Sequence, residues 1–409
     1  MSLEQKVLRR IDSLSSSLVN LTRALVRVPS ENPPGDERGV SQIVRERLES
    51  IGAHVDLVAE LPERVNTLGT IQGSGGGRNL LINGHYDTVP SGDERFWTVG
   101  PFDGAMKDGK IFGRGACDMK SGVAAALIAT QALVDSDASL LGNLLIHAVA
   151  DEEPGSRYGT RYLIEKGYES RKVVDMAVVG EGSVFNDKIY VRPAVRGYQL
   201  FKVTTIGKAH HSSLPSEGIN AVLKMGKVLE ALNSHKFVHD HHQMLPDPSI
   251  VPGTLIKGGT AENVIPELCE AICDVRIVPG MTGEGVLEEA RSVIEFLRTS
   301  DPELRAEVSS VFYWPPSEVA MTAKVYQIAE TVTPKVTGYP LEPLGTSGSN
   351  DTSWLTTLAG IPSIAFGPGD TYQSGEHGPD EWVSVARLVD FAKIYALMAL
   401  EACGVDERR

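Results

Sequence analysis

The sequence predicts an α/β protein whose mostly parallel sheet carries helices on both faces, with a smaller α+β domain inserted into it. Short apolar segments alternate with longer helical segments in the first half of the chain, and the alternation returns near the C-terminus. Residues 190–311 instead show alternating strand patterns around two helical segments. Strands that alternate with helices favour a parallel sheet, because the connecting helices pack on its faces. The chain has 409 residues, enough for two domains.

The first domain is expected to comprise residues 1–189 and 312–409. Residues 1–30 place Leu, Ile and Val at helical spacing among polar residues, which predicts a surface helix covering the core. The later elements follow from apolar segments bounded by turn-forming residues. In chain order they are a strand at 79–84, a helix at 121–135, a strand at 143–150, a helix around 160–167, strands at 173–180 and 361–367, and a helix from Val385 to about Cys403.

The inserted domain is expected to span residues 190–311, with antiparallel strands. Alternation of apolar and polar residues starts at Lys188 and indicates half-buried strands. Cys269 and Cys273 share one strand face with Ala271 and are expected to be buried free thiols, because a thiolate zinc site needs two more ligands. The other expected elements are helices at 218–233 and 282–300 and strands near 251–259, 267–280 and 305–314.

Composition narrows the classes of partner. The formal net charge is −14, which argues against a nucleic-acid partner. No apolar run approaches the roughly 20 residues that span a bilayer. The N-terminal segment lacks the continuous apolar stretch and small-residue cleavage site of a signal peptide. A cytoplasmic protein without a membrane partner is therefore expected.

Metal-capable side chains follow the ends of the predicted strands. In open α/β sheets, ligand sites gather beyond the carboxyl ends of the strands. Each of these residues taken singly is usually a helix cap, a solvated loop residue or a hydrogen-bonded core residue, but their convergence is not easily explained in that way. They are His85 and Asp87 after the first strand, Asp118 before a helix, Asp151, Glu152 and Glu153 after the second strand, Glu181 after the third, and Glu376 and His377 after the fourth.

Imidazoles together with carboxylates suit zinc or a similar divalent ion. One ion would be crowded by so many ligands, whereas two ions that share a carboxylate fit better, as in co-catalytic sites about 3.5–4 Å apart. The sequence therefore predicts a hydrolytic centre with two divalent metals. Zinc is the expected metal, and Co²⁺ or Mn²⁺ would suit the same ligands.

Five segments, in this order, resemble the metal-site motifs of the M20 metallopeptidase family. That family includes acetylornithine deacetylase, succinyl-diaminopimelate desuccinylase, aminoacylase-1 and the carboxypeptidase G type. The resemblance covers essentially the full chain, and the order of five motifs is far more specific than any one of them. The segments are GHYDTVP (84–90), GRGACDMKSG (113–122), DEEPGS (151–156), GEGS (180–183) and GEHGPDEW (375–382).

The resemblance implies a role for each residue of the centre. His85 and Glu181 would bind one metal, His377 and Glu153 the other, and Asp118 would bridge them. Asp87 would orient His85 by accepting its other ring N–H. Glu152 would be the general base for the attacking water. The peptide bond after Asp118 would be cis. Adjacent side chains of an extended segment point in opposite directions, so Glu152 and Glu153 can both reach the centre only from a turn.

The resemblance also implies that the inserted domain is a lid and dimerisation domain. In GKAHHSSLPSEGINA (207–221), spacing from Gly207 selects His211 as the histidine that stabilises the tetrahedral oxyanion, with His210 as the alternative. In many family members this histidine serves the other subunit, so a homodimer is expected. Asn263 and Arg276 would contact substrate on closure, although Arg276 is equally compatible with a structural strand residue. Residues 348–351 correspond to a loop that often lines the substrate pocket.

The expected activity is hydrolysis of the amide bond of a small N-acyl amino acid, of the deacetylase or desuccinylase type. A dipeptidase or carboxypeptidase would use the same centre, because the chemistry at the carbonyl is the same. A non-catalytic binding protein on this fold would be expected to lack a metal ligand or the base, and the sequence retains all of them.

Overall fold

A computed structural model describes residues 1–406, which form two compact units. Unit 1 comprises residues 1–193, 319–345 and 350 onward, and unit 2 comprises residues 194–318 and 346–349. The inserted unit thus begins at Ala194 rather than at residue 190, and ends at Glu318 rather than at residue 311. The reason is a short antiparallel pairing between residues 194–195 and 317–318, which the strand patterns did not indicate.

The central sheet of unit 1 is mixed and mostly parallel where the expected strands lie. Within the described residues its order is β1-β2-β6-β3-β7-β8-β15, with β16 also paired to β7. β3 pairs in parallel with β6 and β7, and β16 pairs in parallel with β7. Its strands are β1 (His54–Val58), β2 (Asn66–Ile71), β3 (Leu80–His85), β6 (Leu144–Val149), β7 (Met176–Phe185), β8 (Lys188–Val191), β15 (Glu342–Pro343) and β16 (Ser363–Asp370).

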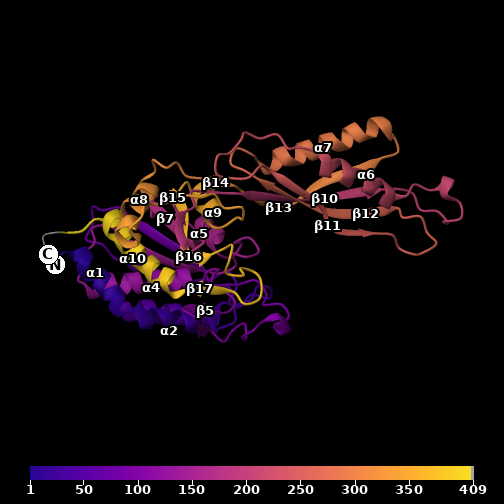
Figure 1. Cartoon of the computed structure of the whole chain (residues 1–409). Coiled ribbons are helices and arrows are strands. Elements are labelled where there is room, and N and C mark those ends of the chain that lie inside the picture. Colours follow the sequence, from indigo (N-terminus) through magenta and orange to yellow (C-terminus); the bar gives the residue numbers. More distant parts are fainter. Residues whose placement is uncertain (407–409) are drawn as a thin grey trace. The chain divides into compact units, whose positions relative to one another are not determined.

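Helices cover both faces of this sheet, as predicted. Along β3, Leu80 and Ile82 face a large apolar core built with α4 and α10, whereas Leu81 faces a smaller cluster that contains Leu355 of α9. Figure 1 shows α4 and α10 lying together. The helices are α1 (Leu3–Ser13), α2 (Ser15–Val26), α3 (Arg38–Ile51), α4 (Lys120–Asp135), α5 (Thr160–Glu165), α8 (Lys324–Thr337), α9 (Thr352–Thr357) and α10 (Val385–Cys403), with the 3₁₀ turn η1 (Glu94–Phe96).

Several elements of unit 1 were not expected from the sequence. Strands β1 and β2 form an antiparallel hairpin at one edge of the sheet, and α8 follows the return of the chain from unit 2. A small antiparallel sheet joins β4 (Ala105–Lys107), β5 (Lys110–Phe112) and β17 (Trp382–Ser384). Its pairing of β17 with β5 lies next to the chain segments that bear Asp118 and His377.

Unit 2 is an antiparallel sheet covered on one face by two helices. The strand order is β11-β12-β10-β13 in the part of the chain that the structure describes. Cys269, Ala271 and Cys273 alternate inward against α6 and α7, and Cys269 and Cys273 are buried free thiols, as predicted; Cys117 and Cys403 are buried and free as well. The elements are β9 (Ala194–Val195), β10 (Gly197–Ile206), η2 (Pro215–Glu217), α6 (Ala221–Ser234), β11 (Ser249–Gly258), β12 (Leu268–Ile277), α7 (Gly283–Ser300), β13 (Arg305–Trp314) and β14 (Ser317–Glu318).

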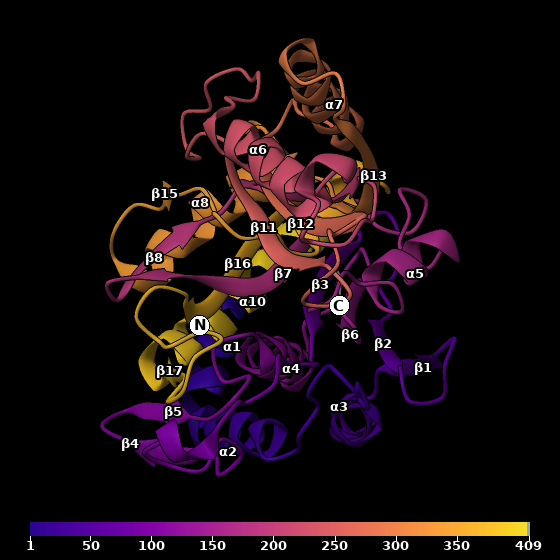
Figure 2. The same cartoon turned by 90° about the vertical axis from the view of Figure 1, so that its right-hand side faces the viewer.

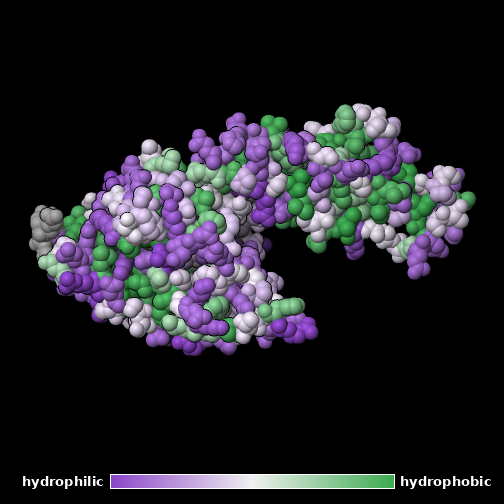
Figure 3. All heavy atoms as spheres, in the orientation of Figure 1, coloured by the Kyte–Doolittle hydropathy of each residue, from purple (hydrophilic) through white to green (hydrophobic). Residues whose placement is uncertain are grey.

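The surface of unit 2 includes exposed apolar strand residues. β11 forms one edge of the sheet, and Val251, Leu255 and Ile256 on it are 58%, 70% and 57% exposed. Apolar residues are visible at the surface of this unit in Figure 3. A search of residues 1–406 finds no helix long and apolar enough to cross a membrane.

Candidate active site

Three neighbouring parallel strands of unit 1 bring His85, Glu153 and Glu181, three of the predicted metal ligands, to one edge of the sheet. β3 ends at His85, the chain after β6 turns through Glu152 and Glu153, and β7 carries Glu181. Because β6, β3 and β7 are neighbours that run in the same direction, their carboxyl ends lie together (Figure 2). Asp118 lies two residues before the start of α4, and His377 lies in the loop between β16 and β17.

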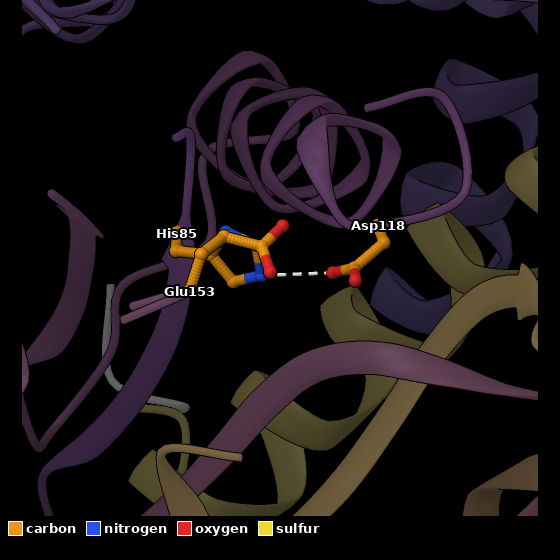
Figure 4. Close-up of side chains that lie close together, drawn as sticks. All are labelled: His85, Asp118 and Glu153. Atoms are coloured by element: carbon orange, nitrogen blue, oxygen red, sulfur yellow. Dashed lines mark hydrogen bonds and ion pairs between the residues drawn. The ribbon is translucent and has the colours of Figure 1, made fainter. Parts of the chain in front are cut away.

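Asp118 lies between the two histidines. Its Oδ1 is 2.8 Å from Nε2 of His85, and its Oδ2 is 3.1 Å from Nε2 of His377. Figure 4 shows His85 and Asp118 facing each other with Glu153 beside them. Glu181 lies 3.2 Å from the same His85 nitrogen, and Glu153 lies 3.3 Å from the same His377 nitrogen. The residues thus divide into two clusters that share one carboxylate. The Asp118–Met119 peptide bond is cis, as the resemblance implied.

A tight turn brings the adjacent residues Glu152 and Glu153 to the same site. Asp151 at the start of the turn and Ser156 at its end have φ values of +62° and +59°. The backbone N–H of Gly155 donates to Glu152 O, and that of Ser156 donates to Asp151 O. Oε2 of Glu152 consequently lies 3.8 Å from Nε2 of His85, while Glu153 faces His377. The turn expected from the sequence is present.

Asp87 contacts His85 and also holds the backbone of this turn. Nδ1 of His85 is 3.0 Å from the backbone oxygen of Asp87 and 3.5 Å from its carboxylate Oδ1. The Asp87 carboxylate also accepts the backbone N–H groups of Glu152 and Glu153, at 3.0 and 3.3 Å. In addition, Nδ2 of Asn32 donates to Asp87 and to Asp151, at 3.0 Å each. Asp87 therefore fixes the backbone of the 151–156 turn, a role that the sequence did not reveal.

Burial and mutual repulsion make this cluster a strong cation site. Burial, reinforced by the charge of Asp118, raises the pKa of Glu153 and of Glu181 to about 7 each. Hydrogen bonds to Asp118 and Glu153 raise the pKa of His377 to about 11. Burial alone would lower the pKa of His85, but the charges of Asp118 and Glu152 outweigh it and raise that pKa. Divalent cations would replace these protons and neutralise the carboxylates.

The donor set fits divalent metals. Ligand atoms lie within 4.8 Å of one another in three groups, namely His85, Asp118 and Glu153; His85, Glu152 and Glu181; and Asp118, Glu376 and His377. Buried Oε2 of Glu376 has no hydrogen-bond partner among the described residues. A buried, unpaired carboxylate oxygen is costly unless a cation is nearby. Imidazole and carboxylate ligands without a thiolate suit Zn²⁺, Co²⁺ or Mn²⁺.

In unit 2, His211 and Asn263 lie on adjacent segments beyond one end of the sheet. Ser212 N donates to Asn263 O at 2.9 Å, and His211 forms an antiparallel bridge with Val264. The backbone N–H of Ser213 donates to Nδ1 of the exposed His211 at 3.2 Å. Since Nδ1 accepts, Nε2 carries the proton in the neutral ring and can donate. The neighbouring His210 has its Nδ1 buried and without a partner in the described part of the chain.

Arg276 lies at the other end of the same sheet. It pairs with Tyr198 in the register of β12 and β10, whereas Leu268 pairs with Ile206 near the end where His211 lies. Its Nη2 is 2.9 Å from Asp274 Oδ2, and its guanidinium lies 4.8 Å from the centre of the Tyr198 ring. The side chain remains 38% exposed.

Three residues have supporting roles that the sequence did not predict, although Asp351 was expected in a loop that often lines the substrate pocket. Asn32 bridges Asp87 and Asp151, as described above. Glu381 accepts the backbone N–H of Asp118 and of Cys117, at 3.1 and 2.8 Å, and so holds the segment with the shared carboxylate. Asp351 is fully buried and faces Ser156 and Thr160. Glu381 lies inside a recognised motif, but its partners come from another segment, so spacing alone does not give its function.

Two histidine–carboxylate clusters joined by one aspartate, at the strand ends of an α/β sheet, define a metal-dependent hydrolase. The chain belongs to peptidase family M20/M25/M40, whose model matches residues 81–401. The family resemblance of the sequence motifs is thereby confirmed, as are the fold class and the assignment as an enzyme.

Named relatives and solved structures agree with this membership. The chain is 31% identical to a succinyl-diaminopimelate desuccinylase of Cereibacter sphaeroides, over 92% of this chain and 96% of the relative. It is 27% identical to an N-formyl-4-amino-5-aminomethyl-2-methylpyrimidine deformylase of Bacillus subtilis, over 97% of both chains. The fold matches the dipeptidase Dug1p of Saccharomyces cerevisiae, with a TM-score of 0.78, 17% identity and all of both chains covered. It also matches the dinuclear metal-binding peptidase YXEP of Bacillus subtilis, with a TM-score of 0.74 and 18% identity, over 97% of this chain and all of that one.

Proposed function

We propose that this protein hydrolyses the amide bond of a small N-acyl amino acid, using two divalent metal ions. The observation that carries the proposal is the position of Asp118, whose two oxygens face two different histidines, each with its own glutamate. His85 and Glu181 would hold one ion, His377 and Glu153 the other, and Asp118 both. Zn²⁺ suits this ligand set, and Co²⁺ or Mn²⁺ suits it as well.

Glu152 is the proposed general base. When bound, the two ions would supply Lewis acidity and lower the pKa of a coordinated water. Glu152 accepts a proton from the attacking water and passes it to the leaving nitrogen, so that the amide and one water become a carboxylic acid and an amine. Burial raises its pKa well above the usual value, so this carboxylate holds a proton more firmly than an exposed glutamate does. Asp87 holds the turn that presents it.

Unit 2 would supply the groups that recognise the substrate and the developing charge. His211 is the proposed donor to the tetrahedral oxyanion, since its accepting Nδ1 leaves an N–H on Nε2. Asn263, one hydrogen-bonded segment away, would assist it, and Arg276 would hold a substrate carboxylate. Arg276 and Leu268 are eight residues apart along β12, which corresponds to about 26 Å at about 3.3 Å per residue.

This separation supports a homodimer. A small substrate cannot span the sheet of unit 2, so His211 and Arg276 of one chain cannot both contact it. If both residues act, one of them comes from a second copy. The exposed apolar residues of edge strand β11 are compatible with such an assembly, because uncovered edge strands favour pairing with another chain.

A matched pair of adjacent substitutions tests the mechanism. Glu152→Gln should lower kcat by about 10²–10⁴-fold while two metals per chain remain bound. Glu153→Gln, one residue away in the same turn, should instead reduce the bound metal, since it removes a ligand. Turnover and metal content by elemental analysis separate the two effects. Unchanged turnover in Glu152→Gln would exclude the proposed base.

A substrate panel tests the substrate class. Metal-loaded protein would be offered N-succinyl-diaminopimelate, N-acetylornithine, other N-acyl amino acids, an N-formyl aminomethylpyrimidine and unblocked dipeptides. Preference for one N-acyl amino acid is the expected result. Cleavage of free dipeptides would support the alternative of a dipeptidase with the same centre, which the likeness to Dug1p motivates. No hydrolysis of the panel by protein with two bound metals would favour a binding protein.

A further inference from the structure

Asp351 is a fully buried carboxylate with no part in the proposed chemistry. It directly precedes α9, and both of its oxygens accept hydrogen bonds from hydroxyl groups of one segment. Oδ1 accepts from Oγ of Ser156, and Oδ2 accepts from Oγ1 of Thr160 at 2.6 Å. A buried carboxylate that receives a hydroxyl on each oxygen fixes both donors, because losing either bond would leave a buried polar atom unsatisfied.

Both donors belong to the segment that presents Glu152. Ser156 closes the 151–156 turn, in which its own N–H donates to Asp151 O at 2.7 Å. Ser156 adopts a φ of +59°, a conformation that is unfavourable for a non-glycine residue and persists only when its surroundings enforce it. Asp351 supplies such an enforcing contact to Ser156, which lies four residues after Glu152. Its anchoring of Ser156 therefore bears directly on where the Glu152 side chain lies.

Thr160 extends the same anchor to the strand that carries His85. Its Oγ1 accepts from Nδ2 of Asn83 at 2.9 Å, and Asn83 lies on β3, two residues before His85. The Asp351 carboxylate thus joins the turn with the base to the strand with a metal ligand. Burial raises the pKa of Asp351 to about 6, so above that pH the group is an anion accepting both hydroxyls.

The anchor also follows directly on a crossing of the chain between the two units. Residues 346–349 belong to unit 2, where Thr346 N donates to Ala194 O and Oγ of Ser349 donates to Arg196 O, at 2.9 and 2.8 Å. The chain is back in unit 1 at Asn350, and Asp351 is the next residue. The side chain of Asp351 points into unit 1, toward Ser156 and Thr160.

We propose that Asp351 is a positioning residue for Glu152, which its buried carboxylate aligns by holding Ser156 and Thr160. This inference rests on the proposed function, in which Glu152 is the base. It assigns Asp351 no contact with substrate or metal. The effect of losing Asp351 should therefore appear in kcat, while KM and the metal content stay unchanged.

Single substitutions give the first test. Asp351→Asn and Thr160→Val should each lower kcat by about 10–100-fold, the range typical of residues that orient active-site groups. Thr160→Ser keeps the hydroxyl and should retain most of the activity. Thr333→Val removes a buried hydroxyl that bonds within α8 and should leave kcat unchanged. Equal loss in Thr160→Ser and Thr160→Val, or a loss that appears only in KM, would overturn the proposal.

A double-mutant cycle with Glu152→Gln shows whether Asp351 acts through the base. In that background, adding Asp351→Asn should cause no further loss of the residual single-turnover rate. A full additional 10–100-fold loss would overturn the proposal, because Asp351 would then act elsewhere. If Asp351→Asn does not fold, Ser156→Ala and Thr160→Val complete the same cycle. Failure of the proposed function is recognised separately, by unchanged turnover in Glu152→Gln alone.

Discussion

The two units of this protein arrange their candidate functional residues in opposite ways. In unit 1, residues far apart in the sequence converge so that their ligand atoms lie within 4.8 Å of one another in three groups, and most of these residues are buried. In unit 2, the candidates lie at opposite ends of one antiparallel sheet and are partly exposed. Parallel strands bring their carboxyl ends to one edge and concentrate side chains there. An antiparallel sheet separates its ends, so His211 and Arg276 of one chain lie too far apart to meet one small substrate.

The largest effect expected from a change in unit 2 tests that division. His211→Ala should lower kcat by about 10²–10³-fold, the usual loss for one oxyanion donor, with metal content unchanged. His210→Ala is the matched control, and equal damage from it would reverse the choice between the two histidines. In a mixture of inactive Glu152→Gln and His211→Ala chains that exchange subunits, each mixed dimer would contain one intact site. Activity should return to about a quarter of the wild-type value per chain.

Failure of this mixture to recover activity, with mixed dimers demonstrated by mass spectrometry, would show that His211 serves its own chain. The geometric contrast between the units would then remain, and an Arg276 that contacts the same substrate would have to come from the second copy. Recovery would sharpen the contrast, since unit 1 would supply the metal ligands and the base of its own active site, while unit 2 would supply His211 to the active site of the partner chain.

Metal removal is expected to affect the units unequally. Without cations, the buried carboxylates of unit 1 repel one another unless some of them are protonated. Unit 2 contains no group of three such ligands within its described residues. At free metal about 100-fold above Kd, each bound ion should contribute about 2.7 kcal/mol to the stability of unit 1. Hydrogen exchange with and without chelator would measure this. Equal loss of protection in α6 and α7 would contradict the separation of the units.

The sequence predicted the centre of unit 1 better than its supports. His85, Glu152 and Glu181 follow predicted strands, so local pattern and resemblance together gave their places. Asn32 and Asp351 could not be found in this way, because their importance depends on which buried hydroxyls, amides and N–H groups they meet across the fold. The β1–β2 hairpin and α8 were missed too, since their residues lack the long apolar segments that predicted the other elements.

Replacing Arg276 should have a smaller effect, which distinguishes a role in binding substrate from a purely structural role in its strand. If it binds a substrate carboxylate, Arg276→Ala should raise KM and lower kcat/KM by about 10–100-fold, corresponding to a charged hydrogen bond of about 1.5–3 kcal/mol. The loss should vanish with a substrate that lacks the carboxylate. A change in thermal stability with unaltered kinetics would instead identify Arg276 as a strand residue that serves Asp274 and Tyr198.

The smallest expected effect concerns Glu376, which lies with Asp118 and His377 in one group of potential ligands. Its buried Oε2 has no hydrogen-bond partner among the described residues, and its ionised carboxylate would add a negative charge beside the proposed metal ions. Glu376→Gln keeps the size of the side chain but removes that charge, so the affinity for the more weakly held metal should fall by about tenfold. Titration calorimetry of metal-free protein measures this without any assay of turnover. Glu165→Gln, at an exposed position on α5, controls for the change in net charge. An unchanged affinity would mean that the charge of Glu376 does not help to bind metal. The inference that cations neutralise all the buried carboxylates of unit 1 would then be wrong.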